Sequence, residues 1–168
     1  MQIINIAAQF KRTAIGKDWG TTKQHNAAVV CGSVLSSGVI WIRSSWLSDT
    51  GSANDWYDED ERCKRDYGAR YAGVDRSQSS AEDRLKSMGF AVYKVNTSVE
   101  LRNGDVAGLI KRKAIFWDSS DPGTRVLYGH ACDYHKDEDG KIVEEKDDDV
   151  DAQGYLVSEL IRPALQVG

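Results

Sequence analysis

The chain has 168 residues, of which 40% are hydrophobic and 29% charged, a composition typical of one folded domain and not of a disordered or fibrous protein. No apolar run approaches the about 20 residues that a membrane-spanning helix needs, so a membrane protein is excluded. Lysine and arginine number 22 against 26 acidic residues, a net charge of −4, whereas a domain that holds nucleic acid by surface charge alone is normally basic. Cys31, Cys63 and Cys132 form no CxxC pair, which favours a reducing cytosol and argues against structural zinc.

The first part of the chain is predicted to form an antiparallel sheet. Residues 1–12 are interpreted as a tail. After them, three runs rich in small and β-branched residues are separated by polar turns, a pattern typical of consecutive antiparallel strands. These predicted strands cover residues 13–18, 27–35 and 39–46.

Strands and helices are predicted to alternate in the rest of the chain. Helices are expected where charged residues and spaced apolar residues lie between a cap and a glycine, and strands where apolar runs are short. The predicted helices are 55–67, 79–87, 99–113 and 147–165, the predicted strands are 70–75 and 90–95, and 114–145 is predicted as strands or hairpins. This order predicts a mixed sheet with helices on its faces.

Acidic residues stand where several of these elements begin or end. Asp18 closes the first predicted strand, Asp75 closes the fourth, and Asp147, Asp148 and Asp151 open the last helix. We expect the carboxylates to converge in one cleft, where they need cations because like charges repel at close range. Hard oxygen ligands suit Mg²⁺ or Mn²⁺. Two such ions about 3.5–4 Å apart can hold the attacking water and the leaving oxygen of a phosphodiester, which indicates a nuclease.

Three segments around these acids resemble the motifs of a known family. They are Gly16–Gly20 (GKDWG), Tyr71–Asp75 (YAGVD) and Lys146–Tyr155 (KDDDVDAQGY). They are similar to the three acidic motifs in the nuclease domain of the large terminase subunit of tailed double-stranded DNA bacteriophages. Segments 83–90 and 125–146 are also similar to the family, and the third motif is the most specific. Two features depart from the pattern: Lys146 stands where members often have histidine, and the extra acid Asp149 shifts the register.

The resemblance implies an α/β RNase H-like (RuvC-type) fold, a mixed sheet with helices on both faces. It also implies an enzyme that cuts double-stranded DNA during genome packaging and uses two Mg²⁺ or Mn²⁺ ions. It implies that Asp18 and Asp75 are catalytic metal ligands. At the third motif Asp148 and Asp151 are both candidates for catalysis and metal binding, and Asp147 ranks below them as a ligand.

The resemblance also bears on organisation and partners. It makes residues 1–168 one nuclease domain, with 1–12 a linker or tail from an upstream ATPase domain. The ATPase motif GxxxxGK[ST] itself occurs nowhere in the chain. The implied partners are DNA, the terminase ATPase domain, the small terminase subunit and the portal protein, in the cytoplasm of the host cell.

Contacts to DNA are expected from basic residues near the motifs or clustered elsewhere. These residues are Lys17, Lys23, Arg76, Lys111 and Arg112. Two alternatives to the terminase interpretation stay open: another RNase H-like nuclease such as a Holliday junction resolvase, and a non-catalytic module whose acids bind a structural ion or a basic partner.

Overall fold

The computed structural model describes residues 10–19, 27–48, 53–133, 138–140 and 148–162. Its strands are β1 Phe10–Asp18, β2 Ala28–Leu35, β3 Ile40–Leu47, β4 Tyr71–Asp75, β5 Ala91–Val95 and β6 Ile115–Trp117. Its helices are α1 Ala53–Tyr67, α2 Ser79–Ser87, α3 Val99–Lys111, α4 Pro122–Asp133 and α5 Asp148–Ile161. Among these described ranges, no helix is long and apolar enough to cross a membrane.

The six strands form one mixed sheet in the order β5-β4-β1-β2-β3-β6. Strand β2 runs antiparallel to β1 and β3, and the other neighbouring pairs are parallel. This confirms the predicted antiparallel start and the mixed sheet. The predicted boundary at residue 12 is wrong, because Phe10 and Arg12, which the sequence assigned to a tail, pair with β2. The first strand therefore begins earlier than expected.

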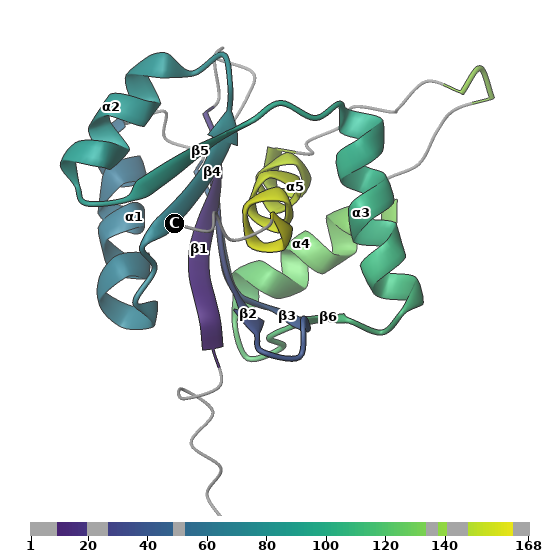
Figure 1. Ribbon diagram of the computed structural model, residues 1–168. Coiled ribbons are helices and arrows are strands. Elements are labelled where there is room, and N and C mark those ends of the chain that lie inside the picture. Colours follow the sequence, from purple (N-terminus) through teal and green to yellow (C-terminus); the bar gives the residue numbers. More distant parts are fainter. Residues whose placement is uncertain (1–9, 20–26, 49–52, 134–137, 141–147, 163–168) are drawn as a thin grey trace, which may run out of the picture.

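Helices cover both faces of the sheet, with α1 and α2 on one side and α3, α4 and α5 on the other (Figure 1). Each face has its own hydrophobic core, and β1 contributes to both because its side chains alternate. Ala14 packs in the core around α5, and Ile15 packs in the core beneath α1 and α2. Burial on both faces explains why the central strands are apolar over most of their length.

Helix α5 lies directly on the central strands because two glycines let it approach. Gly16 of β1 and Gly73 of β4 are register partners. A Cβ atom at Gly16 would collide with the carbonyl of Ala152, and one at Gly73 with the carbonyl of Tyr155. The contact therefore fixes α5 across β1 and β4 and brings its first turn to the carboxyl ends of these two strands.

We expect Gly73→Ala to lower the free energy of unfolding by about 1–3 kcal/mol or more, because the added methyl group meets helix backbone that has no space to move. Gly104→Ala is the matched control: it lies in α3, where an added Cβ meets nothing within 4 Å, and alanine should stabilise the helix by about 0.5–1 kcal/mol. Urea unfolding of both variants checks this. Equal stability of Gly73→Ala and the wild type would contradict the close packing.

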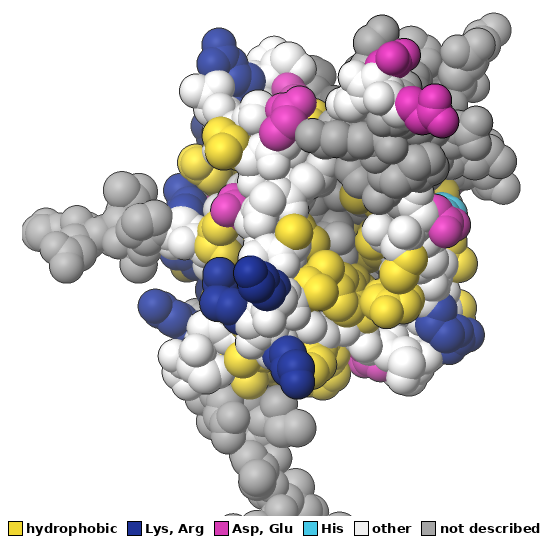
Figure 2. Space-filling view, turned by 90° about the vertical axis from the view of Figure 1, so that its right-hand side faces the viewer, with side chains coloured by type: hydrophobic (Ala, Val, Ile, Leu, Met, Phe, Trp, Pro, Cys, Tyr) yellow, Lys and Arg dark blue, Asp and Glu magenta, His cyan; other side chains and the backbone are white. Residues whose placement is uncertain are grey.

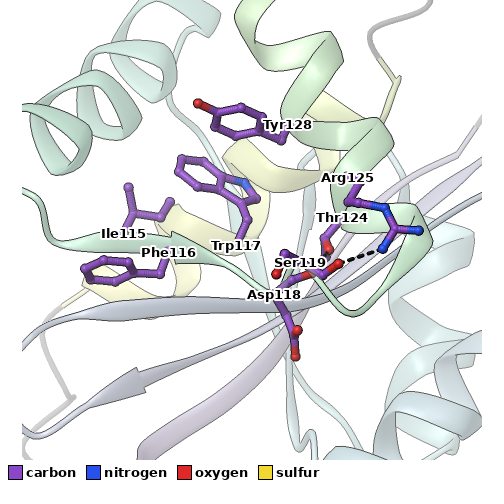
Figure 3. A pocket seen from close by; sticks show the side chains of 8 residues that line it. All are labelled: Ile115, Phe116, Trp117, Asp118, Ser119, Thr124, Arg125 and Tyr128. Carbon is purple, nitrogen blue, oxygen red and sulfur yellow. Dashed lines mark hydrogen bonds between the residues drawn. The ribbon is translucent and has the colours of Figure 1, made fainter.

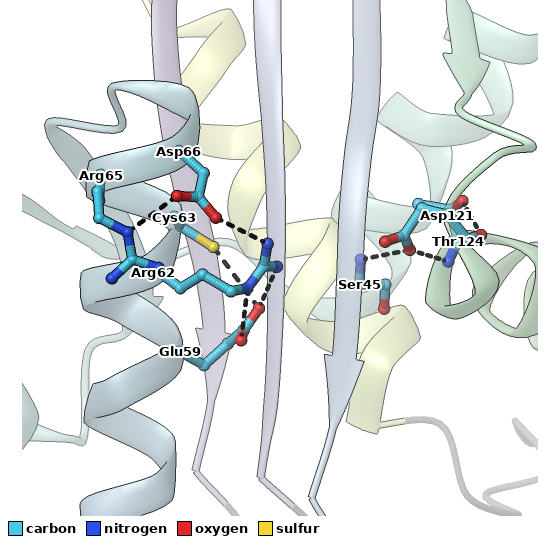
Figure 4. Close-up of polar contacts among 8 residues, drawn as sticks. All are labelled: Ser45, Glu59, Arg62, Cys63, Arg65, Asp66, Asp121 and Thr124. Atoms are coloured by element: carbon cyan, nitrogen blue, oxygen red, sulfur yellow. Dashed lines mark hydrogen bonds and ion pairs between the residues drawn. The ribbon is translucent and has the colours of Figure 1, made fainter.

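One predicted segment is wrong. Residues 114–145 were expected to form strands or hairpins, but residues 114–133 contain the short strand β6 and the helix α4, while residues 134–137 and 141–145 lie outside the described residues. The Asp121 carboxylate caps this helix, accepting from the backbone N–H of Thr124 at 2.8 Å and from that of Ser45 in β3 at 3.4 Å (Figure 4). Asp followed by Pro122 is a helix-start signal, but α4 buries only Thr124 and Leu127, so its apolar periodicity is weak.

Candidate metal centre

Asp18 and Asp75 end neighbouring parallel strands. Their preceding residues, Lys17 and Val74, are register partners in β1 and β4, so the two acids leave the sheet side by side. Side chains alternate along a strand, which places both acids on the same side as Gly16 and Gly73, under α5. The sheet topology thus brings together two acids that are far apart in the sequence.

Tyr155 of α5 marks where the acids converge. Its hydroxyl donates a hydrogen bond to Asp75 Oδ2 at 3.1 Å. Burial raises the pKa of the Tyr155 phenol; Arg102 opposes this rise, and the negative charges of Asp18, Asp75 and Asp151 add to it. The negative charges of carboxylates from β1, β4 and α5 therefore favour the protonated phenol, which stays a hydrogen-bond donor.

The Asp75 carboxylate is held in one orientation. Its Oδ1 accepts from the backbone N–H of Ser77 at 2.7 Å and from the Ser77 hydroxyl at 2.6 Å, while Oδ2 accepts from Tyr155. Burial acts to raise the pKa of Asp75, but the Ser77 and Tyr155 hydrogen bonds and the charge of Arg102 outweigh it, so the pKa lies below its ordinary value. Asp75 is therefore ionised at neutral pH and oriented before any ligand arrives.

The acids of the third motif divide between two sides of α5. Asp148 and Asp151 lie one turn apart on the same face, and Asp151 Oδ1 is 3.8 Å from Arg102 Nη2. Asp149 turns towards α4, where its Oδ2 lies 2.7 Å from His130 Nδ1. Burial raises the pKa of Asp149, and His130 opposes that rise. The helical geometry thus separates Asp149 from the group around Tyr155.

The donor chemistry fits a divalent cation. Asp18, Asp75 and Asp151 offer carboxylate oxygens, the ligands that Mg²⁺ and Mn²⁺ prefer. Within the part of the chain that the structure describes, however, no three acidic, histidine or cysteine side chains form a complete cation-binding cluster. Asp147 lies outside the described residues. The acids therefore lie near one another at one edge of the sheet but do not form a complete coordination site.

Lys17 does not lie at a DNA-facing surface, which corrects the prediction from the sequence. It precedes Asp18, so strand alternation turns it to the opposite face of the sheet, where it is 0% exposed and forms an ion pair with Asp60 of α1. Its ammonium lies 4.2 Å from the ring centre of Trp19 and 4.6 Å from that of Tyr57. Burial lowers the pKa of Lys17 and raises that of Asp60 to about 6, in both cases against their mutual attraction.

The other predicted DNA contacts are spread over the surface. Arg76 is exposed directly after Asp75 and donates to Asn96 Oδ1 at 2.6 Å. Lys111 and Arg112 are exposed at the end of α3 that is farther from Asp75, about 13 Å along the axis from Arg102 at about 1.5 Å per residue. Lys23 lies outside the described residues. Among the described members of this set, Arg76 is the exposed one next to the acids.

A cavity of about 560 Å³ lies between β6 and α4, away from the acids. Ile115, Phe116, Trp117 and Tyr128 give it a mainly apolar lining (Figure 3). Seen from the side of α3 and α4, hydrophobic side chains gather at the surface (Figure 2), and Phe116 and Tyr128 are both about half exposed. Because none of the acids lines it, this cavity is not the candidate metal centre.

Arg102 was not among the predicted site residues. It is 5% exposed and lies beside Asp151, but arginine is mostly an exposed residue type, so no local pattern indicated its burial. Tyr155 was part of the third motif, but no role was assigned to it. Its spacing carried a signal, because it follows Asp151 by one helical turn and so lies on the same face.

No protein-family model and no curated protein matches the chain significantly, but several solved structures share its fold. The large terminase of a thermophilic bacteriophage, in complex with ATP-γ-S, has a TM-score of 0.76 at 20% identity, covering 90% of this chain and 41% of its own. The nuclease domain of the bacteriophage SPP1 large terminase, with bound Mn, has a TM-score of 0.67 at 17% identity, covering 93% of this chain and 91% of that domain.

The nuclease domain of the P22 large terminase is also similar, with a TM-score of 0.68 at 17% identity, covering 86% of this chain and 78% of that one. The chain thus spans about two fifths of the thermophilic phage's large terminase and most of the two isolated nuclease domains. It has the RNase H-like fold of the nuclease domains of bacteriophage large terminases.

Proposed function

We propose that the chain is a metal-dependent endonuclease that cuts double-stranded viral DNA during genome packaging. One observation carries this proposal: Asp18 and Asp75 end two neighbouring parallel strands, and Tyr155, one turn after Asp151 in α5, donates a hydrogen bond to Asp75. A fold alone does not define an activity, so the carboxylates supply the chemical argument and the likeness to terminase nuclease domains supplies the substrate class. Bound Mn in the SPP1 domain supports a divalent metal.

In this proposal Asp18, Asp75 and Asp151 are the metal ligands, with Asp148 beside Asp151 as a further ligand. Bound Mg²⁺ or Mn²⁺, two ions in the proposed reaction, would activate a water and neutralise charge on the phosphate. The chain itself orients the Asp75 carboxylate through Ser77 and Tyr155 before substrate binds, which lowers the cost of assembling the site. Arg76, exposed beside Asp75, would contact the DNA backbone.

The wider assignment follows from the relatives. Because the chain spans 41% of the thermophilic phage's large terminase, we propose that it works with an ATPase domain, and further with a small terminase subunit and a portal protein, in the cytoplasm of the host cell. A domain with a net charge of −4 holds phosphates weakly by charge alone, so a tethered partner would keep it on DNA.

The test is cleavage of supercoiled plasmid in EDTA, Mg²⁺, Mn²⁺ or Ca²⁺. We expect nicked and linear products with Mg²⁺ or Mn²⁺ and none in EDTA, because the carboxylates need divalent ions to bind a phosphodiester. Absence of cleavage with every metal, together with strong stabilisation by Ca²⁺, would contradict the proposal and favour a non-catalytic module. Preference for a four-way junction over linear duplex of the same length would instead favour a junction resolvase.

A further inference from the structure

Arg102 is held in place on several sides next to Asp151. It lies in the first turn of α3 and is 5% exposed. Its Nη1 donates to the Thr97 carbonyl at 2.6 Å, and its guanidinium lies 4.5 Å from the centre of the Tyr155 ring. Its side chain also packs close to Gly154 of α5, where an added Cβ would be 3.4 Å away. A buried arginine with these contacts has little freedom to move.

The charge of Arg102 reaches the carboxylates on both sides of Tyr155. Its Nη2 is 3.8 Å from Asp151 Oδ1, and its guanidinium lies 4.5 Å from the centre of the Tyr155 ring, whose hydroxyl donates to Asp75 Oδ2. Among the described residues, two further basic side chains adjoin the acids in the sequence and are directed elsewhere: Lys17 pairs with Asp60 across the sheet, and Arg76 donates to Asn96. In the metal-free protein, Arg102 therefore supplies positive charge where carboxylates from β4 and α5 meet.

A fixed cation beside a metal site has two opposite effects. Without metal it attracts the carboxylates and offsets their mutual repulsion, which is strong because the site is partly desolvated. When a divalent ion arrives, the same charge repels it and lowers its affinity. Arginine carries a permanent positive charge in proteins, so both effects come from the same fixed charge.

We propose that Arg102 is a positioning residue that takes the place of part of the metal charge in the metal-free protein and thereby weakens metal binding. This inference rests on the proposed function, because it assumes that the acids bind a divalent cation. Arg102 thus holds the acids of β4 and α5 together in the metal-free protein. Because it weakens metal binding, the site fills only at a higher metal concentration than it would without Arg102.

The test compares Arg102→Gln, Arg102→Lys and Arg12→Gln. Arg12 is a matched control: it is also largely buried, pairs with Glu159 at 3.0 Å and lies 4.4 Å from the centre of the Tyr71 ring, but it faces none of the proposed ligands. Melting temperature is measured in EDTA and across a Mn²⁺ titration, and Mn²⁺ affinity is measured from the electron paramagnetic resonance signal of the free ion. Neither readout depends on cleavage.

We expect Arg102→Gln to bind Mn²⁺ roughly tenfold more tightly than the wild type, within the usual range for coupled sites, and to lose stability in EDTA that Mn²⁺ restores. Arg102→Lys, which keeps the charge, should bind Mn²⁺ with nearly wild-type affinity. Arg12→Gln should lose stability to the same extent with and without Mn²⁺.

Unchanged or weaker Mn²⁺ binding by Arg102→Gln would overturn the inference, and so would a variant that stays unfolded even in excess Mn²⁺, because metal should replace the missing charge. If the wild type itself binds no Mn²⁺, the proposed metal site fails, and this inference falls with it. Wild-type binding with no difference between Arg102→Gln and Arg12→Gln overturns the inference alone.

Discussion

Replacing Asp75 by asparagine is expected to lower plasmid cleavage more than about 100-fold, beyond the loss typical of residues that only support metal ligands. Asp18→Asn and Asp151→Asn should have the same effect. Asparagine keeps the size of the side chain but removes the charge that a divalent ion needs from its ligand. Initial rates with Mg²⁺ and with Mn²⁺ measure the loss, and circular dichroism checks that each variant is folded.

The matched control for these variants is Asp149→Asn. It lies in the same turn of α5 and undergoes the same chemical change, but its side chain faces His130, so we expect nearly wild-type cleavage. The comparison decides which acids of the third motif matter. If Asp149→Asn lost cleavage while Asp151→Asn kept it, the metal ligand would lie on the face of α5 that contacts His130. That result would contradict the proposed centre.

Lys17→Met is expected to lower the free energy of unfolding by about 3–5 kcal/mol, because it leaves the Asp60 carboxylate buried without its cation. Asp60 already has one buried oxygen, Oδ1, without a hydrogen-bond partner within the described part of the chain. Denaturant unfolding at neutral pH measures the effect. If Lys17 were an exposed DNA contact, the same substitution would weaken DNA binding and leave stability almost unchanged.

Two further variants show whether the charge pair is the cause. Lys111→Met removes an exposed lysine at the end of α3 and should change stability by less than about 0.5 kcal/mol. The double variant Lys17→Met/Asp60→Leu removes both charges and should recover most of the loss, because burial shifts both pKa values towards the neutral forms. A double variant as unstable as Lys17→Met would assign the loss to packing instead.

The elements with strong local signals were predictable from the sequence. The three antiparallel strands, α1 ended by Gly68, and the strand that ends at Asp75 follow from apolar runs, turn residues and caps, all of which act over a few neighbouring residues. Helix α4 was not predicted, because its capping pair Asp121-Pro122 is followed by residues without a clear apolar periodicity. Its place was decided by contact with β3, where Asp121 also binds the backbone of Ser45.

The acids of the candidate metal centre were likewise predictable in part from local sequence and in part only from tertiary contacts. Their positions at the ends of elements could be read from the sequence, since a carboxylate that closes an apolar strand must leave the sheet at its edge. The sequence by itself determined which acids and which kind of metal to consider. Only the tertiary structure decided that Asp149 faces His130, that Lys17 is buried, and that Arg102 lies beside Asp151 and Tyr155 of α5. These outcomes depend on which face of a strand or helix meets its neighbours, and the close contact of α5 with Gly16 and Gly73 sets that rotation.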